Sequence, residues 1–181
     1  MTTSMAEGKT HDDFNPAHAA QPVQPIPSGC HSISPWIVSR GVGELIEFMK
    51  AAFGAEEQGR TMLGDTIAHA EVKIGDSTIL LFDAQPGWPE IPSLIRLYVE
   101  DGDAVFERAL AAGGKVVTEM AELSFGDRVG RLRDPKGNLW WIQTHVKDVT
   151  PEEMEHPSHA QLDAMEQAMT TLDRELKSRK S

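Results

Sequence analysis

The chain has 181 residues, of which 40% are hydrophobic and 25% charged, which is enough for one well-buried core but not for two ordinary domains. Its formal net charge of -11 disfavours nucleic acid and anionic membranes as partners, because both are bound through basic patches. A single cysteine, no secretory leader pattern and no run of about 20 apolar residues together predict a cytoplasmic protein that does not enter a membrane.

Residues 1–30 are predicted to form a flexible arm. They are rich in Thr, Ala, Gln, Asp and Pro and show no apolar periodicity. Ordered structure is expected from residue 31, so the rest of the chain divides into a domain over 31–149 and a helical extension over 150–181.

The first module of that domain is expected over residues 32–84. Alternating side chains over 32–39 predict a strand. Residues 44–53 then place their apolar side chains on one helical face, and Gly54 follows where a C-terminal capping glycine is common. Three further strands are predicted over 57–62, 66–74 and 77–82.

The second module, over residues 93–147, repeats this order of elements. A strand over 93–99 and a helix over 103–112 are followed by Gly113, which corresponds to Gly54 of the first module. Three more strands are predicted over 115–119, 127–133 and 138–145. The repeated order, at an offset of roughly sixty residues, predicts an α+β fold with two tandem βαβββ modules.

The extension over 150–181 is predicted to be helical. Thr150, Pro151 and Glu153 form an N-terminal capping signature, and a second helix is expected from about Pro157. Its apolar side chains follow three-four spacing at Leu162, Met165, Met169, Leu172 and Leu176. This seam packs on its own domain or on a dimer partner, or it belongs to a frayed or separately docked tail.

Four sequence segments in this order resemble a PhnB-like member of the vicinal oxygen chelate superfamily, which includes glyoxalases, extradiol dioxygenases and bleomycin-resistance proteins. The segments are EFMKAAFGAEE, IAHAEVKIGDSTILL, YVEDGDAVFERALAAGGKV and FGDRVGRLRDPKGNLWWIQTHVKDVTPEEM. The resemblance covers residues 34–154. It implies that each module curls a four-stranded sheet into a half-cup with its helix on the convex side, that a small molecule binds in the cup, and that the protein is a homodimer.

The resemblance also implies where a metal would bind. Metal-dependent members use His, Glu or Gln side chains from the first and last strands of the modules, and these positions correspond here to Ser34, Leu80, Leu94 and Trp141. Leucine and tryptophan offer no lone pair to a cation, and one serine cannot hold a metal ion. We therefore expect neither a metal nor another cofactor, which weakens the case for glyoxalase or dioxygenase chemistry.

Strand alternation predicts which side chains line the cup, if the four aligned positions face it. The candidate ligand-binding residues are Trp36, Phe82, Arg96, Tyr98, Trp141 and Gln143. Such a lining suits a flat or aromatic ligand, unless the tryptophans fill a dimer interface or a closed core. Arg96 either clamps a ligand carboxylate or phosphate, or pairs with Glu71 across the cup.

His69 and Glu71 are the candidate catalytic residues. Their i, i+2 spacing on a strand puts both on the cup face, where they could act as general acid and base, supply two ligands to a relocated metal, or form a structural hydrogen-bonded pair. Asp127, Arg128 and Asp134 are expected to form a local ion-pair network that sets a hairpin.

Three functions remain open. The leading prediction is a protein that sequesters a small aromatic or amphipathic drug or metabolite in the cup without catalysis. The second is a lyase or isomerase of the same superfamily that uses His69 and Glu71, with or without an atypical divalent metal. The third is an interaction module that recruits another protein through the C-terminal seam.

Overall fold

The structure is a computed structural model that describes residues 23–27 and 29–179. Most of the arm predicted over 1–30 lies outside the described residues. None of the described helices is long and apolar enough to span a membrane.

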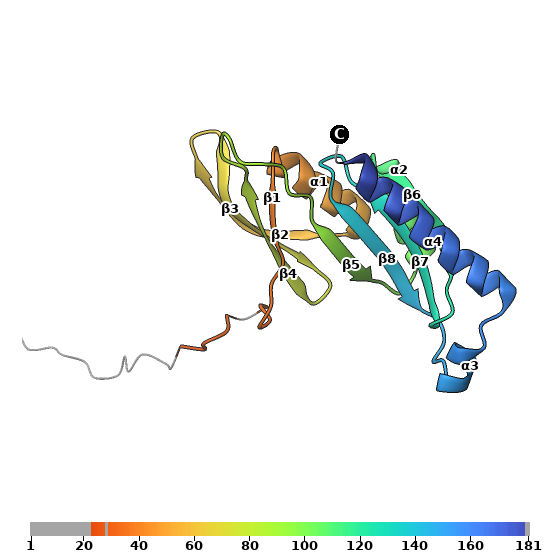
Figure 1. The fold of residues 1–181 in the computed structure, drawn as a ribbon. Helices are drawn as coiled ribbons and strands as arrows, with labels where there is room; N and C mark the ends of the chain where they lie inside the picture. Colours follow the sequence, from red (N-terminus) through yellow and green to blue (C-terminus); the bar gives the residue numbers. More distant parts are fainter. Residues whose placement is uncertain (1–22, 28, 180–181) are drawn as a thin grey trace, which may run out of the picture.

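The first module contains one helix and a four-stranded sheet (Figure 1). Its elements are β1 (Trp36–Ser39), α1 (Val42–Phe53), β2 (Glu56–Leu63), β3 (Thr66–Ile74) and β4 (Ser77–Asp83). The strand order is β1-β4-β3-β2, with β1 parallel to β4 and the other neighbours antiparallel. Gly54 ends α1 as predicted, because its φ of 67° turns the chain so that Gly54 N–H donates to the Lys50 carbonyl and Ala55 N–H to the Met49 carbonyl.

The second module repeats this arrangement. Its elements are β5 (Leu94–Tyr98), α2 (Gly102–Ala111), β6 (Lys115–Glu122), β7 (Asp127–Arg133) and β8 (Leu139–His145). The strand order is β5-β8-β7-β6, again with the first and last strands parallel. The predicted α+β fold with two tandem βαβββ modules is therefore confirmed, and the strands form two separate sheets.

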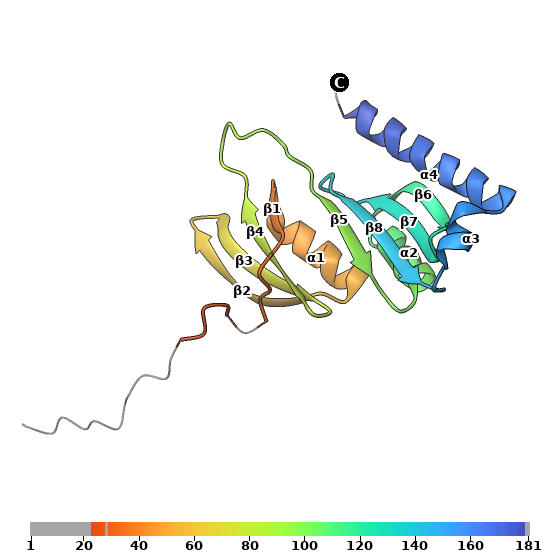
Figure 2. The same cartoon turned by 60° about the horizontal axis from the view of Figure 1, so that its bottom comes forward.

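One hydrophobic core joins the two modules at their helices. α1 packs against α2, and both helices cover the back faces of the sheets (Figure 2). Strand side chains that alternate with the predicted cup-lining residues are completely or nearly completely buried at Ile37, Ile79, Leu81, Trp140 and Ile142. The predicted alternation of strand side chains therefore holds in both modules.

Two more helices follow the second module, α3 (Pro151–Glu155) and α4 (His159–Ser178). Each begins with a capping box, formed by Thr150 with Glu153 and by Ser158 with Gln161. α4 packs on its own domain, which is one of the alternatives left open by the sequence, and it runs along β6 (Figure 1).

α4 covers the face of the second sheet that is opposite to α2. A Cβ on Gly130 of β7 would lie 2.9 Å from Phe106 of α2, so Gly130 faces that helix. The next residue, Arg131, donates a hydrogen bond to the Ala168 carbonyl of α4. Because neighbouring strand residues face opposite sides, the two helices sandwich the sheet.

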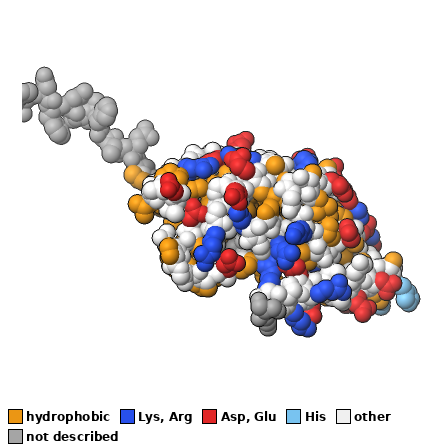
Figure 3. Space-filling view, turned by 90° about the horizontal axis from the view of Figure 1, so that it is seen from above, with side chains coloured by type: hydrophobic (Ala, Val, Ile, Leu, Met, Phe, Trp, Pro, Cys, Tyr) orange, Lys and Arg blue, Asp and Glu red, His pale blue; other side chains and the backbone are white. Residues whose placement is uncertain are grey.

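The packed face of α4 agrees only in part with the apolar seam expected from the sequence. Of the seam, Met165 packs against the sheet and Leu172 is partly buried, whereas Leu162, Met169 and Leu176 are exposed. Ala168, outside the seam, is the buried residue of α4, and its small side chain allows close approach to the sheet. On the face seen from above, acidic and basic side chains are interspersed with exposed hydrophobic ones (Figure 3).

Candidate functional site

The concave face of the first sheet carries an open group of aromatic rings. The ring centroid of Phe82 on β4 lies 5.0 Å from that of Trp36 on β1 and 5.3 Å from that of His69 on β3, both in edge-on geometry. Trp36 is 56% exposed. Three strands thus bring predicted site residues together on a surface that a flat molecule can reach.

His69 and Glu71 lie on the same face, as their spacing predicted. The His69 Nε2 atom is 3.1 Å from Glu71 Oε1, and both side chains are half-exposed. A shallow cavity of about 290 Å³ lies beside them, lined also by residues 58–61. The structure therefore shows the hydrogen-bonded pair, which was one of the alternatives that the sequence left open.

The donor set on the concave faces does not suit a divalent metal. Of the four aligned positions, Ser34 alone has an oxygen lone pair. Within residues 23–27 and 29–179, no three His, Cys, Asp or Glu side chains come close enough to hold a metal ion.

On the second sheet, Trp141 lies between two guanidinium groups. The register of β5, β8 and β7 places Arg96 and Arg131 on either side of Trp141. The guanidinium carbon of Arg96 is 4.5 Å from the Trp141 ring centroid, and that of Arg131 is 3.8 Å away. Arg96 thus stacks on Trp141 and does not pair with Glu71, whose partner is His69.

Arg131 is the residue of this site that sequence reasoning missed. Its side chain is buried to 1% exposure, and its Nη1 donates to the Ala168 carbonyl at 2.6 Å and to Thr118 Oγ1 at 3.2 Å. Burial, and then the positive charge of Arg96, lower the pKa of Arg131 to about 10. Carrying the alternation from Trp141 across the β7–β8 pairing could have placed Arg131 on this face.

Tyr98 and Gln143 meet at the buried carboxylate of Asp127. Tyr98 donates its hydroxyl to Asp127 Oδ2 at 3.2 Å, and Gln143 donates its Nε2 to the same oxygen. His145 Nδ1 lies 2.6 Å from Asp127 Oδ1. Tyr98 is exposed at the sheet edge, whereas Gln143 is completely buried, so a ligand can reach Tyr98 alone in this conformation.

The prediction that Asp127, Arg128 and Asp134 form a local ion-pair network is wrong. Arg128 pairs with Asp103 at the start of α2, and the two groups are 2.5 Å apart. Asp134 bonds to N–H groups of its own turn and of Trp140. Arg128 thus points toward α2. Strand alternation within the hairpin does not predict this contact, because Asp103 belongs to a helix outside the hairpin.

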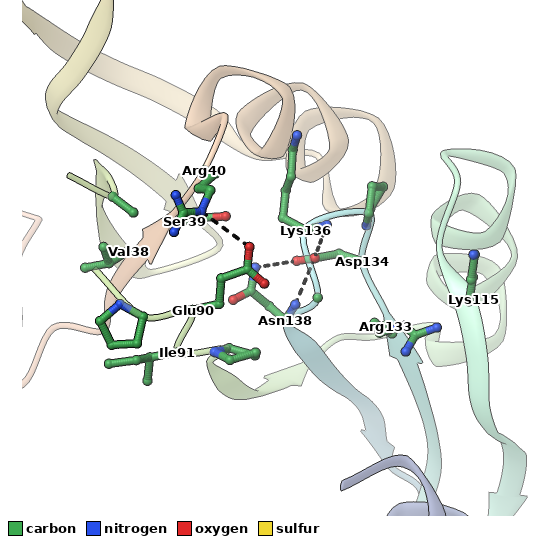
Figure 4. A pocket seen from close by; sticks show the side chains of 15 residues that line it. Val38, Ser39, Arg40, Glu90, Ile91, Lys115, Arg133, Asp134, Lys136 and Asn138 are labelled. Carbon is green, nitrogen blue, oxygen red and sulfur yellow. Dashed lines mark hydrogen bonds and ion pairs between the residues drawn. The ribbon is translucent and has the colours of Figure 1, made fainter. Parts of the chain in front are cut away.

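Two larger cavities lie outside the aromatic group of the first sheet, and the predicted residues Arg96 and Tyr98 line one of them. One, of about 500 Å³, lies where the turn between β7 and β8 approaches the loop between β4 and β5 (Figure 4). Its arginine and lysine side chains are largely paired, for example Arg40 with Glu90 at 3.4 Å and Arg133 with Glu175 at 3.2 Å. The cavity is therefore not a free anion site.

The second cavity, of about 820 Å³, follows the edge strand β5. Its lining is largely apolar and includes Ile33, Ile79 and Ile95. The edge of the second sheet at β5 is therefore open to a further strand or to another chain.

Comparison with known proteins connects this architecture to a family. The model of the Glyoxalase/Bleomycin resistance protein/Dioxygenase superfamily matches residues 32–142. An uncharacterized protein of Mycobacterium bovis is 34% identical over 144 residues, which are 73% of this chain and 95% of that protein.

Solved structures share the fold at low sequence identity. The crystal structure of TioX from Micromonospora sp. ML1 has a TM-score of 0.54 at 20% identity, covering 66% of this chain and all of TioX. A glyoxalase/bleomycin resistance protein/dioxygenase family enzyme from Burkholderia phytofirmans has a TM-score of 0.52 at 19% identity, covering 61% of this chain and 95% of its own.

Proposed function

Because the chain belongs to the glyoxalase/bleomycin resistance protein/dioxygenase superfamily, we propose that it binds a small aromatic or amphipathic molecule on its concave sheet faces and sequesters it without metal chemistry. Membership of the PhnB-like branch and a cytoplasmic location stay predictions from the sequence. The family alone does not select this function, since one fold carries many activities.

The observation that carries the proposal is the open aromatic face of the first sheet. The rings of Trp36, Phe82 and His69 come from three strands and lie 5.0 to 5.3 Å apart, with Trp36 more than half exposed. Exposed aromatic groups gathered on a concave face favour stacking of a flat ligand. The lack of lone pairs at three of the four aligned metal positions favours binding over metal-dependent catalysis.

The test uses Prodan, a neutral planar fluorophore, as the probe. We expect Prodan to bind the full chain and Trp36→Ala to weaken the binding at least about tenfold, because loss of an aromatic stacking partner removes both buried area and ring contact. Trp88→Ala is the matched control, since Trp88 lies in the loop between β4 and β5. Equal affinities of the wild type and Trp36→Ala, or no binding at all, would refute the proposal.

The proposal includes a homodimer in which half-cups of two chains face each other. Two observations support it: β1 and β5 are edge strands of their sheets, and an apolar cavity follows β5. A sheet edge bordered by apolar surface favours pairing with another chain.

The hydrogen-bonded pair of His69 and Glu71 supports a second candidate, a lyase or isomerase of the same superfamily. The 3.1 Å contact on the open face suits proton transfer to a bound ligand. His69→Gln discriminates the two functions. In a sequestering protein Trp36 and Phe82 remain, so His69→Gln weakens Prodan binding less than Trp36→Ala does, whereas an enzyme loses turnover by about 100-fold or more because the acid–base group is gone.

A further inference from the structure

The buried guanidinium of Arg131 is the starting point, because its surroundings do not explain its charge. Among the described residues no carboxylate pairs with Arg131, although its side chain is 99% buried. Burying a cation without a counter-ion is costly, and proteins keep such groups where they bind something. The partners that Arg131 does have are a hydroxyl and a backbone carbonyl.

Three buried polar atoms without hydrogen-bond partners belong to this one face of the second sheet. They are Arg131 Nε, Trp141 Nε1 and Gln143 Oε1. Arg131 and Trp141 are directly paired across β7 and β8, and Gln143 is two residues further along β8 on the same face. Buried polar groups are nearly always paired, so three unpaired ones on neighbouring strands indicate a place for a polar ligand.

Two of these atoms, Arg131 Nε and Trp141 Nε1, are N–H donors, and the side chains that carry them are in contact. The Arg131 guanidinium lies 3.8 Å from the Trp141 ring centroid, and the Arg96 guanidinium stacks on the same ring at 4.5 Å. A carboxylate could accept from both donors while its charge offsets that of Arg131. An aromatic ring attached to that carboxylate would find the exposed aromatic and cationic groups of β5 next to it.

In the described conformation α4 covers this place. The Ala168 carbonyl accepts from Arg131 Nη1 at 2.6 Å, but it also accepts from the Thr171 hydroxyl at 3.2 Å, so it is a shared and uncharged acceptor. The buried hydrophobic residues of this contact are Leu123, Val129 and Ala168, and Phe125, Trp141, Ala164 and Met165 pack against them while partly buried. This cluster is separate from the main core, so α4 can open without unfolding the modules.

We propose that Arg131 and Trp141 form a subsite for the carboxylate of an aromatic ligand, and that α4 closes this subsite and competes with the ligand for Arg131. The inference rests on the proposed small-molecule-binding function and adds the charge of the ligand and the element that controls access. Because α4 covers the two free donors, a ligand reaches Arg131 Nε and Trp141 Nε1 only when α4 lifts away and its Ala168 carbonyl leaves Arg131 Nη1. Ligand binding and docking of α4 therefore exclude each other. The apparent affinity is reduced by the fraction of molecules in which α4 is docked.

The test locks α4 in place in the full chain. Thr118 of β6 and Thr171 of α4 have hydroxyl oxygens 2.6 Å apart, so the triple variant Cys30→Ser, Thr118→Cys, Thr171→Cys can be cross-linked by a disulfide and released by reduction. Comparing the oxidised and reduced forms of one protein avoids any difference in sequence.

The probes are benzoate and its neutral analogue benzamide, titrated while the indole N–H signals are followed by NMR, with Trp141 assigned by Trp141→Phe. We expect benzoate to move the Trp141 N–H signal and to bind the reduced form at least about tenfold more tightly than the oxidised form. Benzamide should bind at least about tenfold more weakly than benzoate, because a charge-assisted hydrogen bond is worth roughly twice a neutral one.

Arg131→Met and its control Arg128→Met complete the design. Both remove one positive charge from β7, but Arg128 pairs with Asp103 of α2, on the other side of the sheet from α4. We expect Arg131→Met to lose benzoate binding at least about tenfold and Arg128→Met to stay within about threefold. If Arg131→Met fails to fold, the comparison of benzoate affinity between the oxidised and reduced forms still tests whether α4 competes with the ligand.

An unmoved Trp141 signal, equal affinity for benzoate in both redox forms, or benzamide binding as tight as benzoate would each overturn the subsite. The Prodan experiment reports separately on the first sheet. Prodan binding without benzoate binding rejects the subsite and leaves the proposed function standing, whereas failure of both probes rejects both.

Discussion

Asp134 shows how one side chain holds a turn between two strands. Its Oδ1 accepts from the backbone N–H groups of Lys136 and Asn138 at 2.8 and 3.0 Å, and its Oδ2 accepts from Asn138 Nδ2 at 2.9 Å and Trp140 Nε1 at 2.8 Å. The carboxyl group is almost completely buried. Removing it leaves buried donors unpaired, which costs more than the loss of the bonds themselves.

We therefore predict that Asp134→Ala lowers the free energy of unfolding by about 3 kcal/mol, measured by urea denaturation with tryptophan fluorescence. Asp173→Ala is the control, because it removes an exposed carboxylate that pairs with Lys177 one helical turn away. It should change the stability by about 0.5 kcal/mol or less. A loss below about 1 kcal/mol for Asp134→Ala would mean that the turn does not depend on this carboxylate.

His145 makes the stability depend on pH in a defined direction. Hydrogen bonds to Asp127 and then to Asp148 raise the pKa of His145 above its usual value of about 6.5. Because the pKa is higher in the folded state, the stabilisation is fully present below about pH 6.5 and is lost as the pH rises through the raised folded value.

The prediction is that the NMR titration midpoint of His145 lies above about 6.5 and moves downward in Asp148→Asn. The difference in Tm between the wild type and His145→Gln should be largest near pH 6 and should shrink as the pH rises through that midpoint. A midpoint at or below the usual value would contradict the contact geometry of 2.6 Å to Asp127 and 3.0 Å to Asp148.

Among the elements, α4 is held to the domain by a small cluster that is separate from the main core. Its capping box defines where it begins, and its docking places Ala168 close to Leu123 and Val129. A methyl group fits there because the helix lies close to the sheet. A larger side chain at this position cannot be accommodated without lifting the helix.

We predict that Ala168→Leu speeds hydrogen exchange of α4 amides by at least about tenfold and leaves the amides of β3 unchanged, because overpacking costs roughly 1 to 3 kcal/mol. Thr170→Leu is the control, since it introduces the same side chain on the exposed side of α4. If the amides of β3 accelerate to the same extent, α4 opens only when the whole domain unfolds.

At the scale of the whole molecule, the exposed apolar side chains favour a homodimer. Leu94 and Tyr98 on the edge strand β5 are 64% and 57% exposed, and Trp36 on the edge strand β1 is 56% exposed. These side chains lie on one edge strand of each sheet. Exposed apolar side chains on a sheet edge favour contact with another chain.

Light scattering on the full chain should therefore give twice the monomer mass of 19.9 kDa. We expect Leu94→Lys to raise the dimer dissociation constant by at least about tenfold, because it places a charge in an apolar contact. Leu63→Lys at the turn between β2 and β3 introduces the same charge away from these edges and should leave the mass unchanged. A monomeric wild type would refute the dimer.

Much of the fold follows from the sequence. The strands over residues 66–74 and 127–133 were predicted with their observed bounds, and other elements differ by a few residues at their ends. Gly54 was predicted as a helix cap and has the expected positive φ. The sequence also predicts which side chains share a face of a strand, because one residue of known orientation assigns the faces of all the others by alternation.

The candidate site follows only in part. Alternation placed Trp36, Phe82 and Trp141 on concave faces, as the structure has them. It did not reveal that Arg96 stacks on Trp141, that Arg131 lies on the other side of that ring, or that Gln143 is buried at Asp127. Each of these depends on the register between strands, which hydrophobic pattern alone does not specify for polar residues.

The order of the elements, the faces of the strands and the family resemblance can be predicted from the sequence, because hydrophobic period, turns and caps act within a few residues. The docking of α4 and the polar groups that it buries depend instead on tertiary packing. Arg131 and Ala168 are 37 positions apart in the chain, and they meet because small side chains let a helix approach a sheet closely. Such shape complementarity depends on both surfaces at once, so the sequence pattern of either segment alone does not predict the contact.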